Sequence, residues 1–106
     1  MSQLHVVFGA GSLGSAVQRA LLAGGHKVRA VSRSGRGALP GAEVHRADAS
    51  DPAQARTACA GAAAVYNCAA PPYTDWPRLY PALQKGLVEG AAAAGAVLVS
   101  AENVYV

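Results

Sequence analysis

A group of glycines near the start of the chain constrains the fold more than any other feature. Gly9, Gly11 and Gly14 form the spacing G-x-G-x-x-G directly after the apolar, valine-rich residues 4–8. A continuous apolar run of this length is typical of a strand that is buried on both faces. Apolar residues at helical spacing follow the glycines and stop at the Gly-Gly pair of residues 24–25. The pattern predicts a strand, a tight turn and a helix in succession.

The spacing of these glycines is typical of a turn that binds a dinucleotide. In such a turn the first glycine permits the bend, the second lets a pyrophosphate approach the backbone, and the third lets the helix pack closely on the strand. The helix N-terminus then presents free N–H groups and a partial positive charge to the phosphates. We expect Ser12 to be the N-cap of this helix. We therefore predict a bound dinucleotide, and the alternative is a tight turn without a ligand.

The whole chain alternates predicted strands and helices. The expected strands are residues 4–8, 27–31, 43–46, 63–67 and 96–99. The first helix is expected to form one apolar face from Leu13, Ala16, Val17, Ala20 and Leu21. Later helices are expected from Asp51 and Pro52 to about Cys59, and through Leu79, Leu83, Leu87 and Ala91 to a stop at Gly95. This alternation predicts an α/β fold of three layers, with a doubly wound parallel sheet in the strand order 3-2-1-4-5.

The residues after the second strand indicate which dinucleotide to expect. NAD-binding proteins of this type usually carry an acid there, about 20 residues beyond the glycines, whereas this chain has Ser32 and Arg33. A hydroxyl and a guanidinium suit a ribose 2′-phosphate, and Arg36 is a candidate second clamp. NADP is therefore predicted as the preferred cofactor, with NAD still open. The alternatives are solvated loop arginines or, more remotely, a flavin site, which would also prefer an acid here.

Two further segments are expected to contact the nucleotide. Asp48, after the third strand, is placed where a carboxylate could meet an adenine amino group, and an Asx turn is the equal alternative. Ala49 is predicted to contact the nucleotide beside it. After the fourth strand, Cys68 and Ala69 are small residues against which a cofactor ribose could lie. Open α/β sheets bind ligands at this carboxyl edge.

Composition excludes several other classes of protein. The 106 residues suit a single domain, and a net charge of +3 without an arginine cluster favours a small anionic ligand over nucleic acid. Cys59 and Cys68 lack metal-ligand spacing and indicate free thiols in a reducing compartment. The sequence has no signal-peptide pattern and no long apolar window, so we expect a cytoplasmic protein without a membrane partner. His5, His26 and His45 are expected to be structural.

Five segments, taken in order, resemble a known family: "VFGAGSLG", "VSRSGR", "RADASD", "YNCAAPP" and "LVSAENVYV". The chain resembles the NAD-dependent epimerase/dehydratase family, within the extended short-chain dehydrogenase/reductases, over essentially its whole length. Many members carry G-x-x-G-x-x-G, and here Phe8 stands where the first of those glycines would be. The resemblance implies a Rossmann fold, with nucleotide contacts at Gly9, Gly11, Ser12, Leu13, Gly14, Ser32, Arg33, Asp48, Cys68 and Ala69.

The resemblance also implies catalytic residues that this sequence lacks. It contains no Tyr-x-x-x-K pair, and Ala101 stands where the family has Ser or Thr. We expect residues 1–106 to be one NAD(P)-binding domain, the N-terminal part of a longer NADP-linked oxidoreductase or sugar-nucleotide epimerase with a small-molecule substrate. The alternative is a non-catalytic module that binds NADP and senses redox state. Because the fifth strand would have an unpaired edge, we also expect a homo-oligomer that forms through it.

Overall fold

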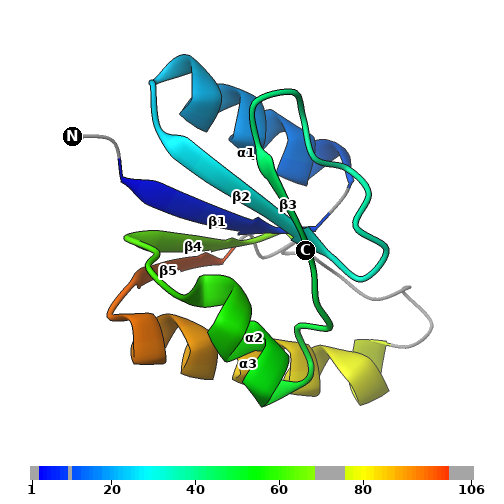
Figure 1. Ribbon diagram of the computed structural model, residues 1–106. Helices are drawn as coiled ribbons and strands as arrows, with labels where there is room; N and C mark the ends of the chain where they lie inside the picture. The colour runs from blue at the N-terminus through cyan, green and yellow to red at the C-terminus, as the bar shows by residue number, and fades with distance from the viewer. Residues whose placement is uncertain (1–2, 10, 69–75, 101–106) are drawn as a thin grey trace, which may run out of the picture.

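A single parallel sheet organises the chain. The structure is a computed structural model that describes residues 3–9, 11–68 and 76–100. The strands are β1 (Leu4–Phe8), β2 (Lys27–Ser32), β3 (Glu43–Arg46), β4 (Ala64–Asn67) and β5 (Val97–Ser100). They pair in the order β3-β2-β1-β4-β5, all in parallel (Figure 1). The predicted strand order is confirmed, and every predicted strand boundary is correct to within one residue.

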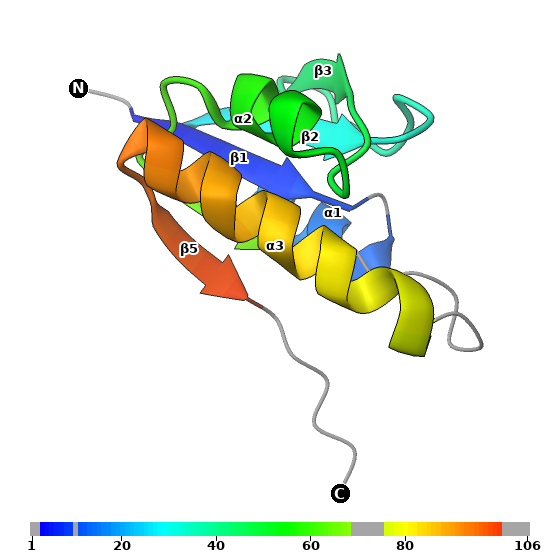
Figure 2. The ribbon, with the colours of Figure 1, turned by 90° about the horizontal axis from the view of Figure 1, so that it is seen from below.

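Helices cover both faces of the sheet and complete the three layers. They are α1 (Ser12–Ala23), α2 (Pro52–Cys59) and α3 (Trp76–Ala94). α1 lies on one face, and α2 and α3 lie side by side on the other (Figures 1 and 2). This is the doubly wound arrangement that the alternation of strands and helices predicts.

The apolar run at residues 4–8 is the central strand. Val6, Val7 and Phe8 of β1 are at most 1% exposed. Val6 and Phe8 belong to one core cluster with Val65 of β4 and Leu87 of α3. Because helices cover both faces of β1, nearly every position along it is buried, which explains why all its residues except His5 are apolar.

The predicted apolar face of α1 is buried only in part, because Val17 and Leu21 are half-buried and its other three residues are exposed. The fully buried residues of the helix are Gly14 and Gln18, whereas Leu13 is 48% exposed and both Ala16 and Ala20 are exposed. The reason is the close approach of α1 to the end of β1. This approach selects a residue without a side chain at the point of contact, and Gln18, one turn further on, faces the same way. The apolar residues of the expected face lie beside the stripe formed by Gly14 and Gln18, or on the opposite side of the helix.

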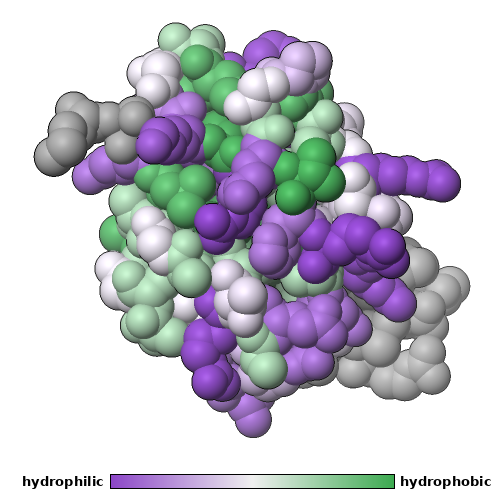
Figure 3. Space-filling view, viewed as in Figure 1, coloured by the Kyte–Doolittle hydropathy of each residue, from purple (hydrophilic) through white to green (hydrophobic). Residues whose placement is uncertain are grey.

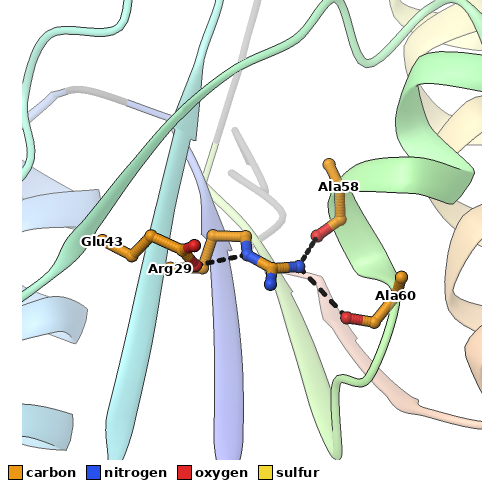
Figure 4. Close-up of polar contacts among 4 residues, drawn as sticks. All are labelled: Arg29, Glu43, Ala58 and Ala60. Carbon is orange, nitrogen blue, oxygen red and sulfur yellow. Dashed lines mark hydrogen bonds and ion pairs between the residues drawn. The ribbon is translucent and has the colours of Figure 1, made fainter.

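Side chains hold both ends of α2. Asp51 Oδ1 accepts a hydrogen bond from the Ala53 N–H (3.0 Å), so the predicted N-cap is confirmed. At the other end Arg29 of β2 donates to the carbonyl oxygens of Ala58 (2.8 Å) and Ala60 (3.1 Å). Arg29 also forms an ion pair with Glu43 of β3, at 2.6 Å between Nε and Oε2 (Figure 4). These contacts tie α2 to the β2–β3 edge of the sheet.

Candidate functional site

The glycine turn has the geometry that its sequence predicts. Gly9 has φ 120°, a conformation that side-chain-bearing residues rarely adopt, and its N–H donates to the Val31 carbonyl at 2.9 Å. A Cβ at Gly14 would clash with the Gly9 carbonyl oxygen. At Gly11, by contrast, nothing lies within 4 Å of the place that a Cβ would occupy. The first and third glycines therefore build the turn, and the second leaves open space beside it.

The first N–H groups of α1 have no acceptor within the helix. The N-cap is Gly11, whose carbonyl accepts the first helical bond from Ser15 N–H at 3.0 Å, and no side chain caps the helix. The prediction that Ser12 is the N-cap is therefore wrong, since Ser12 is the first helical residue. The N–H groups of Ser12, Leu13 and Gly14 precede that first bond and have no acceptor within the helix. No acid lies in the first turn, so the positive end of the helix dipole is uncompensated there.

Cys68 lies against this turn at the carboxyl end of β4. Its N–H donates to the Phe8 carbonyl at 2.8 Å, and its Cβ is 3.7 Å from the position of a Cβ at Gly14. Burial raises the pKa of the Cys68 thiol above its usual value. A thiol that stays protonated is a poor nucleophile, so this burial favours the predicted role of Cys68 as a small residue beside the cofactor over a reactive one.

The loop after β2 is held by α1. Ser32 Oγ donates to the Arg36 carbonyl at 2.9 Å, which closes the loop on itself. Gln18, fully buried, donates from Nε2 to the Gly37 carbonyl and accepts at Oε1 from Leu39 N–H, both at 2.9 Å. Sequence reasoning missed Gln18. The available signal was a polar residue one helical turn after Gly14, on the face that approaches the sheet.

A hollow of about 380 Å³ opens beside this loop, and two of its lining residues were not predicted. Arg33 and Asp48 were expected in the site, whereas Arg46 at the end of β3 and Gln54 of α2 were not. The complete lining is Arg33, Arg46, Ala47, Asp48 and Gln54. Hydrophilic side chains gather over β3 and beside α2 on the face seen in Figure 3.

Asp48 forms the Asx turn that was one of its two expected roles. Its Oδ1 accepts from the Ser50 N–H at 3.0 Å and from Ser50 Oγ at 2.6 Å, and its own N–H donates to Gln54 Oε1 at 2.8 Å. The hydrogen bonds from Ser50 lower the pKa of Asp48 below its ordinary value, and the charge of Arg33 lowers it further. Asp48 is therefore a carboxylate at neutral pH, and its contact with an adenine amino group stays a prediction.

Ala49 and Arg36 were also predicted to contact the nucleotide, and neither lines the hollow. Ala49 is 5% exposed and belongs to the core, with its carbonyl oxygen against Gly86 of α3. Arg36 is exposed on the loop and is not part of the lining. Ala69 lies outside the described residues, as does Ala101. The roles of these residues in binding stay predictions.

Within residues 3–9, 11–68 and 76–100, no three His, Cys, Asp or Glu side chains come together as a metal site would need. Nor is any helix in these ranges both long and apolar enough to cross a membrane.

Solved structures share this architecture. A protein from Burkholderia pseudomallei is 33% identical, with a TM-score of 0.76 over 92% of this chain and 47% of its own. Uronate dehydrogenase from Agrobacterium tumefaciens is 25% identical (TM-score 0.74; 94% of this chain and 40% of its own). A variant of that enzyme complexed with NAD has the same identity and TM-score, over 95% of this chain and 41% of its own. A UDP-galactose 4-epimerase is 25% identical (TM-score 0.74; 92% of this chain and 37% of its own). The chain thus spans less than half the length of each.

Fold and site together define a dinucleotide-binding domain of the Rossmann type. A model of the NAD(P)H-binding family matches residues 9–105, and the chain belongs to that family. The resemblance to the NAD-dependent epimerase/dehydratase family is confirmed for the NAD(P)-binding domain, because its structural neighbours include an epimerase and a dehydrogenase. No curated protein matches the sequence.

Proposed function

We propose that the chain is the NADP-binding part of an oxidoreductase or of an epimerase/dehydratase-like enzyme. The observation that carries this proposal is the start of α1, where three N–H groups without helical acceptors lie beside the open space at Gly11. These donors and the uncompensated dipole suit the pyrophosphate of a dinucleotide. When bound, the nicotinamide supplies hydride transfer, and the residues of this chain bind and orient the cofactor.

Arg33 supports the preference for NADP over NAD. It follows the last residue of β2, is exposed, and lines the hollow beside the loop after that strand. A guanidinium there suits a ribose 2′-phosphate, whereas NAD sites of this fold place an acid at this position to bind the ribose hydroxyl groups. Ser32 donates its hydroxyl proton to the Arg36 carbonyl. Its oxygen can then only accept hydrogen bonds, and a phosphate needs donors, so Ser32 would stabilise the loop more than it would bind the phosphate.

The second candidate is a non-catalytic module that binds NADP and responds to its redox state. It is favoured by the sequence, because these 106 residues contain no Tyr-x-x-x-K pair to transfer a proton. The activities of the neighbouring uronate dehydrogenase and epimerase favour the enzyme instead. In both cases the part played by this chain is to bind the cofactor.

The test is a titration of the purified chain with NADPH and with NADH, followed by nicotinamide fluorescence. NADPH is expected to bind more tightly, and Arg33→Ala should lower its affinity roughly tenfold or more, because a charge-assisted contact is lost. NADH affinity should change little, and Arg19→Ala, an exposed arginine on the other face of the sheet, is the control for overall charge. Failure of both cofactors to bind at millimolar concentration would overturn the proposal.

A further inference from the structure

Two guanidinium groups, not one, line the hollow beside the loop after β2. Arg33 follows β2 and Arg46 ends β3, and the register pairs Ser32 with Arg46 at the same edge of the sheet. Asp48 is the carboxylate in the lining, and its Oδ1 already accepts two hydrogen bonds from Ser50. Within the described residues the ion pair found is that of Arg29 with Glu43, so neither arginine of the hollow has such a partner there.

The position of Arg46 is set by the loop after β2. Gly35 has φ +77°, and a Cβ at this residue would come to 2.7 Å from Cγ of Arg46 and 3.1 Å from its Cδ. The aliphatic stem of Arg46 therefore lies directly against the Gly35 backbone. The same loop is anchored to α1 further along, at Gly37 and Leu39, by Gln18. The loop thus carries Arg33 and also supports Arg46.

The charge of the lining indicates the ligand. Two guanidinium groups and one carboxylate leave a surplus of positive charge in a space of about 380 Å³. A phosphate monoester carries about −1.5 to −2 charge at neutral pH and offers three acceptor oxygens, which two planar guanidinium forks can share. A ribose hydroxyl offers neither the charge nor enough acceptors for two arginines.

We propose that Arg46 is a second specificity-determining residue, which binds the ribose 2′-phosphate of NADP together with Arg33. This inference rests on the proposed function, since it requires that the adenosine half of the cofactor enters the hollow. Arg46 comes from the edge strand, 13 positions after Arg33 in the sequence, and the fold brings both to one phosphate.

The test uses two small ligands that differ only in the 2′-phosphate, 2′,5′-ADP and 5′-AMP, each titrated by calorimetry into the purified chain. Arg46→Met removes the charge and keeps an unbranched stem to pack against Gly35. Arg33→Met and the double variant complete a cycle, and Arg19→Met on α1 controls for net charge. Thermal melts of every variant check that the fold is intact.

For the wild type we expect 2′,5′-ADP to bind at least tenfold more tightly than 5′-AMP. Arg46→Met should weaken 2′,5′-ADP roughly tenfold and change 5′-AMP less than twofold. If Arg33→Met lowers the preference for 2′,5′-ADP over 5′-AMP and Arg46→Met does not, the inference fails while the proposed NADP site stands. An equal loss for both ligands in Arg46→Met would also overturn it. If the wild type binds neither ligand, or binds both equally, the proposed NADP site fails as well.

Discussion

At the scale of single residues, Gly14 determines how closely α1 approaches the end of β1. A Cβ at this position would clash with the Gly9 carbonyl oxygen, and backbone atoms there have little freedom to move. Gly14→Ala is expected to lower the free energy of unfolding by about 1–3 kcal/mol, as overpacking does in other proteins. Urea denaturation measures this loss. Gly11→Ser is the control, because it adds a side chain to the same turn where nothing lies within 4 Å; an equal loss in both variants would contradict the account.

His5 makes stability depend on pH. It is 9% exposed, its Nδ1 lies 2.9 Å from the Tyr66 hydroxyl, and its ring centroid is 4.5 Å from that of His26. Burial lowers the pKa of His5 below its ordinary value of 6.5, and the charge of His26 lowers it further. The unfolded chain therefore takes up this proton at a higher pH than the folded one. Stability is complete above pH 6.5 and falls as the pH drops from 6.5 towards the lowered pKa.

This dependence is measured by urea denaturation between about pH 8 and pH 5. His5→Phe should remove part of the loss of stability on acidification, because the variant has no proton to bind at this position. His45→Gln, on the edge strand β3, is the matched control and should retain the wild-type slope. If the slope of His5→Phe equals that of the wild type, another group causes the pH dependence.

At the scale of elements, Gln18 links α1 to the loop that carries Arg33. Removing its side chain would leave the Gly37 carbonyl and the Leu39 N–H without their partner. Gln18→Ala is expected to lower the free energy of unfolding by about 1–3 kcal/mol, the cost of unpaired buried polar groups. It should also reduce the discrimination between NADPH and NADH, because the loop loses its anchor. Urea denaturation and the cofactor titration measure the two effects, with Gln3→Ala, an exposed glutamine, as the control.

Strands and turns could be predicted from local sequence, and the contacts of individual side chains could not. Strand boundaries follow from apolar runs bounded by glycine and polar residues. The strand order follows from the alternation of strands with helices, because parallel strands joined in this way form a doubly wound sheet. The buried face of α1 was predicted only in part, because tight packing, rather than hydrophobicity, selects Gly14 and Gln18 as its fully buried residues. Gln18 and Arg46 were missed because their partners lie far along the chain; the hydrogen bonds of Gln18 span 19 and 21 positions.

At the scale of the whole molecule, β5 offers an exposed apolar surface. Val97 is 65% exposed and Val99 is 46% exposed, and β5 pairs only with β4 among the strands of the described residues. We expect the chain to form a homo-oligomer through this strand. Light scattering at micromolar concentration should show a dimer, and Val97→Lys with Val99→Lys should convert it to a monomer. A monodisperse wild-type monomer would contradict this expectation.

The central claim is that the glycine turn binds the pyrophosphate of a dinucleotide, and Gly11→Asp tests it most directly. Gly11 is the N-cap of α1, with φ −81° and ψ −171°, and has open space at the Cβ position. Aspartate is a good N-cap, so the variant should melt at or above the wild-type temperature. Its carboxylate would occupy the helix N-terminus and repel the phosphates.

The measurement is the NADPH titration of this variant beside the wild type. Our account predicts that the affinity for NADPH falls by roughly a hundredfold or more, because a like charge replaces the space for a phosphate, while the fold stays as stable. Unchanged NADPH affinity in a well-folded Gly11→Asp chain would show that the turn is a structural element only and that the cofactor binds elsewhere.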